Sequence, residues 1–403
     1  MIAETISLGI LSLPSAVAAL GIVPAIVIII SLGLLATYTG YVIGQFKMRY
    51  PHVHNMADAG EVLMGPIGRE ILGAAQLLFL VFIMGSHILT FIVMMNTLTD
   101  HGTCSIVFGV AGMILSLVLA LPRTLKNVSW LSISSFISIL AAVFVTMIGI
   151  AIQHPGKAVE ITVKSDLYHA FLAVSNIVFA YAGHVAFFGF ISELKEPAGY
   201  PKALYLLQGS NTTLYTVSAI VIYIYGGKDV ASPALGSTGP ILRKVAYGVA
   251  MPTIVIAGVI NGHVASKYLY VRIFRGTNKM SQRTFLSLGT WVAITVVLWV
   301  IAWIIAEAIP VFNNLLSLIT ALFASWFTCE FLPIQLNHLA LQYENKQLIM
   351  GSTDGLSGLF WLYINKGKYF SSPRKIFLTF LNSFVFVAGA TIVSVKSRIP
   401  KLV

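Results

Sequence analysis

The stretch Ser7-Leu8-Gly9-Ile10-Leu11-Ser12-Leu13-Pro14 places a glycine, two serines and a proline inside an apolar run of helix length. A proline inside a helix removes one backbone hydrogen bond and clashes with the preceding turn, which costs about 3 kcal/mol in a soluble helix. In lipid, backbone carbonyl groups freed in this way are tolerated only where protein encloses them or where they line a cavity. The stretch therefore predicts either an ordinary proline kink or a helix that is interrupted for a function.

A second apolar run of the same kind covers residues 168–192 and includes Asn176-Ile-Val-Phe-Ala-Tyr-Ala-Gly-His-Val-Ala-Phe-Phe188. An aromatic residue with a polar tip, a glycine and a histidine lie near its middle. This run is the sixth in the chain and the stretch quoted above belongs to the first. Five helices repeated in inverted orientation would place both interruptions at equivalent positions, and such paired interruptions indicate a transport site. The pair favours a function over a kink.

Composition places the chain in a membrane. Of its 403 residues 57% are hydrophobic and 10% are charged, and the mean hydropathy is +0.88. Soluble domains carry about 25% charged residues, so lipid must cover this surface. Only helices and closed barrels satisfy the backbone in lipid, and the runs 23–42 and 291–308 exceed the roughly ten-residue strands of a barrel. We therefore expect an all-α integral membrane protein in contact with the lipid bilayer.

Apolar runs of about 20 residues predict eleven spans. They cover residues 1–20, 22–46, 70–99, 103–121, 128–152, 168–192, 203–225, 242–266, 285–308, 311–332 and 377–395. The first run begins inside a helix, so we expect a native amino terminus to lie upstream of Met1.

These spans form a single transmembrane domain. We expect a first five-helix repeat at 1–152 and a second at 168–332, both of the leucine-transporter type with interrupted helices 1 and 6. Residues 333–376 are expected to form a cytoplasmic loop with an interfacial helix, because the apolar run there is too short to span. The helix at 377–395 completes the domain.

The distribution of the positive charges, which give a net charge of +11, indicates how the chain is oriented in the membrane. With a cytoplasmic start, the inner loops hold 17 of the 25 Lys and Arg residues and the outer side holds 8, as the positive-inside rule requires. The basic tail after residue 395 runs against this bias. Since cytoplasmic loops account for the charge, we expect no nucleic acid partner.

The chain offers little for other chemistry. Cys104 and Cys329 lie in unlike settings, which predicts neither a disulfide framework nor a metal site. No nucleophile–base pair converges in the spans, as an enzyme would need, and no nucleotide-binding loop indicates transport driven by ATP. We expect no enzyme activity and no cofactor, apart from a coupling proton or sodium ion.

Four segments, taken in order, resemble the amino acid/auxin permease family, and the details are most similar to its fungal neutral amino acid permeases. The segments are Glu4–Gly21, Met56–Arg69, Phe179–Ala203 and Val311–Leu318. They extend over nearly the whole chain. The resemblance implies eleven spans, a leucine-transporter-type core and uptake of neutral amino acids.

Interrupted helices suit an α-amino acid, because their ends present free amides to a carboxylate and free carbonyls to an ammonium group. We expect the substrate to meet residues at both interruptions. Phe179 and Tyr181 would shape a side-chain pocket. The backbone groups of the substrate would meet Thr5, Ser7, Gly9 and Ser12. Gly183 would either take a backbone angle that a larger residue disfavours or let the substrate approach the chain.

Coupling to a proton requires a group that titrates in the membrane. His184 lies at the second interruption and Glu4 lies just before the first, and an intramembrane ionisable residue is a functional candidate by default. His87 is a further candidate for the cavity, although a packing role fits it better. Sodium coupling is the alternative, with Asn261 and Ser266 as ion ligands. The centre of the same span, Ile254 to Ile260, is mostly aliphatic, which favours coupling to a proton.

A receptor that binds an amino acid and signals without net transport remains a second function. Its mark would be a long cytoplasmic extension. The plasma membrane is the expected location, with the vacuolar membrane as the alternative, and the sequence assigns no oligomeric state.

Overall fold

The computed structural model describes residues 5–123, 128–153, 159–274 and 284–324, together with residues 375, 379, 380 and 383. Every regular element in these ranges is a helix. Glu4, the loop expected at 333–376 and nearly all of the span expected at 377–395 lie outside the described residues.

The helical elements follow the interrupted pattern of the sequence. In chain order they are η1 (Gly9–Leu11), α2 (Leu13–Leu20), α3 (Ile22–Arg49), α4 (Met56–Leu98), α5 (Ser105–Ala120), α6 (Val128–Gln153), α7 (Leu167–Ala180), η2 (His184–Ala186), α8 (Phe187–Glu193), η3 (Pro197–Gly199), α9 (Tyr200–Gly226), η4 (Gly227–Asp229), η5 (Ala234–Ser237), α10 (Pro240–Phe274), α11 (Phe285–Ala308), α12 (Phe312–Ile319) and the π-helical turn η7 (Thr320–Ala324).

Length and apolar composition confirm an all-α integral membrane protein. Within the described ranges, 6 segments are long and apolar enough to cross a membrane: Ile22–Arg49, Met56–Leu98, Trp130–Gln153, Leu167–Glu193, Pro240–Phe274 and Phe285–Ala308. Three shorter apolar helices are Gly9–Leu20, Ser105–Ala120 and Phe312–Phe323. The expected total of eleven spans stays a prediction.

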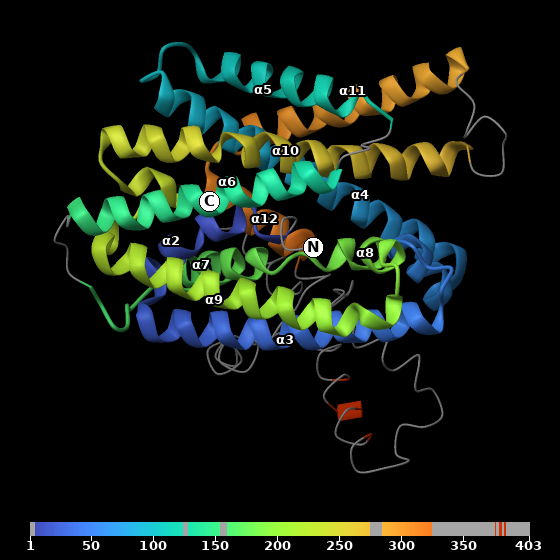
Figure 1. Ribbon diagram of the computed structural model, residues 1–403, viewed down its shortest axis with the longest axis horizontal. Helices are drawn as coiled ribbons and strands as arrows, with labels where there is room; N and C mark the ends of the chain where they lie inside the picture. Colours follow the sequence, from blue (N-terminus) through green and yellow to red (C-terminus); the bar gives the residue numbers. More distant parts are fainter. Residues whose placement is uncertain are drawn as a thin grey trace, which may run out of the picture.

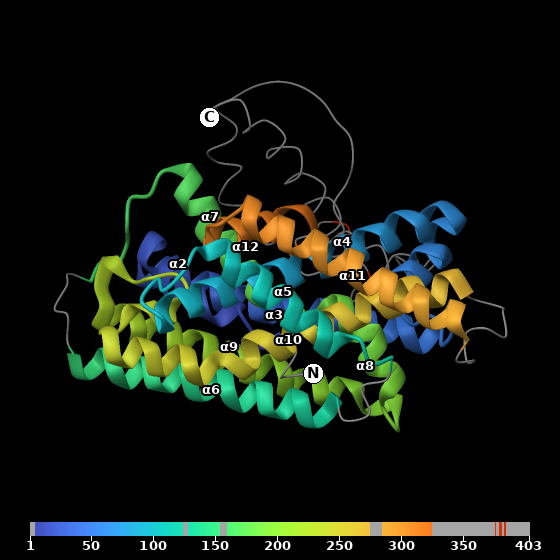
Figure 2. The ribbon, with the colours of Figure 1, turned by 90° about the horizontal axis from the view of Figure 1, so that it is seen from above.

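The helices pack in two groups. The α3 group contains α2, α3, α7, α8 and α9, and the α10 group contains α4, α5, α6, α10 and α11. Figure 1 shows α3 and α9 along one side of the molecule and α5 and α11 along the other, and the long helices still run lengthwise when the view is turned (Figure 2). Helix α12 contacts α7 of one group and α4 of the other. The groups also contact each other directly where α6 packs on α9.

The backbone carbonyls of α3 accept hydrogen bonds from the segment that connects α7 to α9. Three side chains between the end of α7 and the start of α9 contact carbonyl oxygens spaced along α3. The Tyr181 hydroxyl is 3.0 Å from the oxygen of Ile29, the His184 Nε2 is 3.0 Å from that of Ala36, and the Tyr200 hydroxyl is 3.1 Å from that of Gly40. Each carbonyl gains a second donor without leaving the helix. These bonds fix the register of the interrupted segment on α3.

Helix α4 begins earlier than the sequence suggested, because residues 56–64 are helical and not a loop. Asn55 caps this segment by accepting a hydrogen bond from the Asp58 amide at 2.9 Å. The chain then reverses at Gly65, whose φ is +69°. A Cβ built on Gly60 would lie 2.4 Å from the carbonyl oxygen of Gly68. The short segment therefore folds back onto the start of the long one, with glycines at the contact.

Candidate functional site

The second interruption separates α7 from α8. The amides of Tyr181 and Ala182 donate to carbonyls only three residues back, at 3.0 Å each, and the Gly183 amide donates to Tyr181 at 2.8 Å. The α-helical ladder therefore stops at Ala180, and α-helix resumes only at Phe187. The expected discontinuity is present.

The first interruption precedes α2. The Ser7 amide donates to Thr5 at 3.2 Å, and the first regular turn closes with Leu11 donating to Leu8 at 3.0 Å. Pro14 lies in the first turn of α2, where its missing N–H is not needed. The interpretation as a mid-helix proline kink is therefore wrong.

Two glycines bring the interruptions together. A Cβ on Gly9 would lie 2.7 Å from the Cα of Ala180, and a Cβ on Gly183 would lie 2.3 Å from the Cγ2 of Thr5. The φ of Gly183 is −81°, an angle that any residue adopts. Gly183 is thus required for the space that Thr5 occupies and not for a left-handed backbone.

Helix α9 binds the freed backbone groups at both interruptions. The buried Tyr215 hydroxyl lies 2.8 Å from the carbonyl oxygen of Ala180 and 3.2 Å from that of Thr5. One turn earlier, Asn211 Nδ2 donates to Thr5 Oγ1 at 3.2 Å. Within a membrane, a carbonyl without a helical partner must find a donor in the protein. The single Tyr215 proton is closest to the Ala180 carbonyl, while the Thr5 carbonyl beside it also accepts from the Ser7 amide at 3.2 Å.

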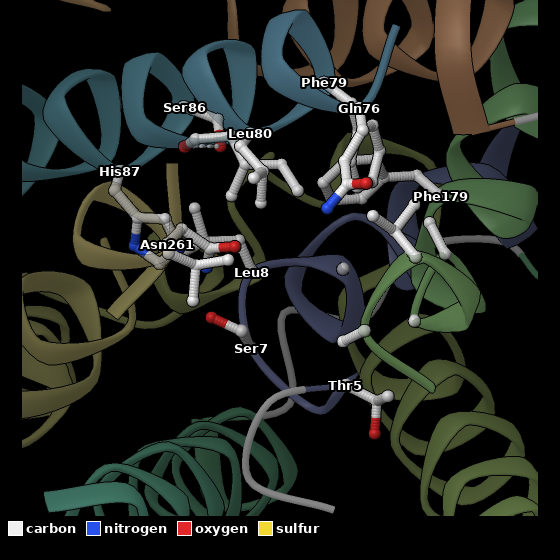
Figure 3. A pocket seen from close by; sticks show the side chains of 17 residues that line it. Thr5, Ser7, Leu8, Gln76, Phe79, Leu80, Ser86, His87, Phe179 and Asn261 are labelled. Carbon is white, nitrogen blue, oxygen red and sulfur yellow. Dashed lines mark hydrogen bonds between the residues drawn. The ribbon is translucent and has the colours of Figure 1, made fainter. Parts of the chain in front are cut away.

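A cavity of about 100 Å³ opens beside the two interruptions, between the α3 group and the α10 group. Figure 3 shows Ser7 and Leu8 from the first interruption and Phe179 from α7 on its walls, facing side chains of α4 and α10. The lining residues are Thr5, Ser7, Leu8, Gly9, Gln76, Phe79, Leu80, Ile83, Ser86, His87, Phe179, Ala182, Gly183, Val185, Ala186, Asn261 and Val264.

The lining is mostly apolar and holds no Asp, Glu, Lys or Arg among the residues that the structure describes. Several of its polar groups are already used within the protein. His87 Nδ1 lies 2.9 Å from the carbonyl of Ile254, and Asn261 Nδ2 donates to Ala257 at 2.9 Å. The buried Ser7 hydroxyl, by contrast, has no hydrogen-bond partner within the described ranges. A ligand here meets a neutral wall with a few polar points.

The structure brings together six of the residues expected at the site. The cavity lining includes Thr5, Ser7, Gly9, Phe179, Gly183 and Asn261.

Four expected residues point elsewhere. Tyr181, expected to shape the pocket, reaches instead to α3, and Ser12 donates to its own turn at Gly9 with a distance of 2.8 Å. His184 is fully buried against α3, with Thr39 Oγ1 at 3.0 Å from its Nε2. Ser266 is buried but is not part of the lining.

Apart from His87, which was a candidate for the cavity, the residues of one wall were not expected at the site. It is a stripe on α4 formed by Gln76, Phe79, Leu80, Ile83 and Ser86, with His87 beside it. The spacing of three and four residues is that of one helix face. Gln76 and Ser86 are polar residues in an otherwise apolar run, which was the signal available in the sequence.

The chain is similar to known amino acid transporters in sequence and to a solved protein structure in fold. The family described as transmembrane amino acid transporter protein matches residues 1–349. The N amino acid transport system protein of Neurospora crassa is 38% identical, over 98% of this chain and 81% of that protein. A transmembrane transporter of Gibberella moniliformis is 33% identical over 81% of this chain and 71% of its own length. The crystal structure of MhsT in complex with L-phenylalanine shares the fold, with a TM-score of 0.50, 14% identity, and coverage of 95% of this chain and 97% of MhsT.

The Thr5 contact makes Gly183 a sharp test of the site. We expect Gly183→Leu to abolish amino acid uptake while the protein still folds, because the side chain must displace Thr5 from the cavity wall. Gly189→Leu is the matched control, since a Cβ there meets nothing within 4 Å. Uptake by reconstituted vesicles and thermal unfolding in detergent would be measured for both. Uptake by Gly183→Leu with unchanged kinetics would contradict the assignment.

The Tyr215 hydroxyl should stabilise both interruptions. We expect Tyr215→Phe to lower the free energy of unfolding by about 1–3 kcal/mol, since the buried Ala180 carbonyl loses its donor. Tyr205→Phe, on the same helix but 56% exposed, is the control and should change stability little. Thermal unfolding of the two purified variants makes the comparison. Equal stability of Tyr215→Phe and the unmodified protein would show that the Ala180 carbonyl finds another donor.

Proposed function

The chain belongs to the family of transmembrane amino acid transporter proteins, and from this premise we propose that it is a secondary active symporter of neutral amino acids, coupled to protons. Members of the family are transporters and not enzymes, so the cavity is a place for binding and passage. The observation that carries the proposal is the cavity beside the two interrupted helices, whose described lining carries no Asp, Glu, Lys or Arg.

The lining supports a neutral side chain on the substrate. A buried charge without a partner is strongly unfavourable, and the described lining offers no carboxylate or basic group to pair with one. Leu8, Phe79, Leu80 and Phe179 instead present apolar surface. A cationic or acidic side chain would therefore be rejected, while small and apolar side chains would be accepted.

The interruptions supply partners for the α-carboxylate and α-ammonium groups. The first hydrogen-bonded amide of η1 is that of Leu11, so the amides of Gly9 and Ile10 precede the helical ladder, as at any helix start. Helix starts favour anions and helix ends favour cations. We propose that the carboxylate binds at the start of η1 and the ammonium group at the end of α7.

The two helix groups support an inverted five-helix repeat within an eleven-span protein. Each of the first four segments of one half belongs to the same group as the segment of equal rank in the other half. Helices α2, α7 and α8, then α3 and α9, lie in the α3 group, while α4 and α10, then α5 and α11, lie in the α10 group. Because the cavity lies between the groups, tilting one against the other would open it first to one side of the membrane and then to the other.

Coupling to protons needs a titrating group near the substrate. His87 lines the cavity, and its Nδ1 faces the Ile254 carbonyl, so in the neutral ring Nε2 is left to accept a proton. His184 remains a candidate only if its contact with α3 opens during transport, and Glu4 lies outside the described residues. Asn261 and Ser266 would be the ligands of a sodium ion in the alternative mechanism.

We place the transporter in the plasma membrane, with the vacuolar membrane as the alternative. Proteoliposome uptake tests the function without regard to this choice. We expect L-alanine to accumulate under an inward proton gradient, a sodium gradient alone to have no effect, and L-lysine and L-glutamate to compete poorly. Accumulation driven by a sodium gradient alone would show that sodium and not the proton is the coupling ion. Binding without any uptake would favour a receptor.

The same vesicles separate the two histidines. His87→Gln should keep exchange of labelled alanine across the membrane but lose accumulation against a gradient, because the introduced amide cannot titrate. His184→Gln should show the same loss only if the α3 contact opens. Concentrative uptake by both variants would contradict coupling through either ring.

A further inference from the structure

Gln76 connects the cavity to the folded-back start of α4. Its side chain is 4% exposed and lines the cavity. Its Oε1 accepts a hydrogen bond from the backbone amide of Met56 at 3.0 Å. Met56 is the first residue of the segment that reverses at Gly65 and packs on the start of the long helix. The reversal thus places a backbone donor beside a cavity side chain 20 residues away in the sequence.

This bond fixes which end of the amide faces the ligand. A glutamine amide has one oxygen that accepts and one nitrogen that donates. Since a backbone N–H can only donate, the oxygen must face Met56 and the nitrogen must face away from it. In Figure 3 the Gln76 nitrogen points toward the side of the cavity where Leu8 lies. Within the described residues Nε2 makes no hydrogen bond of its own.

We propose that Gln76 Nε2 is a fixed hydrogen-bond donor for an acceptor oxygen of the amino acid substrate. The inference rests on the proposed function and adds a specificity-determining residue to it. The acceptor is either the α-carboxylate or a carbonyl or hydroxyl oxygen of the side chain. Met56 acts as a positioning residue, because its amide prevents the glutamine from turning and offering its oxygen instead.

A fixed donor in an apolar wall discriminates strongly. A ligand that reaches Nε2 with an oxygen forms a hydrogen bond in a dry site, whereas a ligand without one leaves the donor buried and unpaired. A ligand group that is itself a hydrogen-bond donor would bind poorly at this point, because it would face another donor. Gln76 therefore selects for an oxygen at this point of the cavity, in a wall that otherwise selects only for shape.

Two substitutions separate the donor from the structural bond. Gln76→Glu keeps an oxygen for the Met56 amide but at pH 8.5 has no N–H to offer. Gln76→Met keeps the length and bulk of the side chain and offers no donor at any pH. We expect both variants to bind L-alanine or L-glutamine about tenfold or more weakly than the unmodified protein. At pH 5.5 the introduced carboxyl can take up a proton and donate again, so binding by Gln76→Glu should partly recover.

The control is Gln153→Glu at the end of α6. Its Oε1 also accepts a backbone amide, that of Gly239, at 2.7 Å, but it is exposed and not part of the cavity. This variant should bind both amino acids with unchanged affinity at both pH values. Equilibrium binding of radiolabelled substrate to purified full-length protein gives the affinities, and thermal unfolding shows which variants are folded.

The two substrates identify the acceptor. Weaker binding of alanine and glutamine alike assigns the donor to the α-carboxylate, and weaker binding of glutamine alone assigns it to the side chain. Unchanged affinity of Gln76→Met for both, or of Gln76→Glu at both pH values, overturns the proposal. If the unmodified protein bound neither amino acid, the proposed function itself would fail. That result differs from unchanged binding by the variants, which overturns only the role of Gln76.

Discussion

The requirement that backbone polar groups find partners inside a membrane governs this structure. Two helices stop within their spans, and each break exposes carbonyls and amides that lipid cannot satisfy. The breaks are placed against each other by Gly9 and Gly183, and the Tyr215 hydroxyl lies within hydrogen-bond distance of a carbonyl from each. The backbone amides and carbonyls that these contacts leave unused face a cavity. The site therefore exists because protein groups bind the backbone of the two breaks on the side of α9, while the backbone on the side of the cavity stays available to a ligand.

The same requirement connects the site to movement. Helix α3 carries the second interruption through side-chain bonds to its carbonyls, so the interrupted segments belong to a single packed group. Helices α4 and α10 form the opposite wall and belong to another. A ligand between the groups touches both, and its binding free energy can favour one relative position over another. The fold-back at Gly65 gives the α4 wall a second attachment, from Met56 to Gln76.

The sequence predicted the places where the backbone breaks better than the directions of side chains. Gly9, Gly183 and Thr5 were expected at the site and lie there, because glycines and hydroxyls within an apolar run mark a break directly. Tyr181 and His184 follow the break, where the helical period no longer indicates a direction, and both turned to α3. Gln76 could not be assigned from the sequence because its role depends on a reversal at Gly65 that brings Met56 back beside it.

The central claim is that an amino acid binds to the open backbone groups of both interruptions. Hydrogen–deuterium exchange of the purified protein, with and without saturating L-alanine, tests this most directly. The account predicts slower exchange for the amides of residues 8–10 and 182–185 together, with little change in the exposed end of α6. Protection confined to one interruption, or found only elsewhere in the chain, would contradict it.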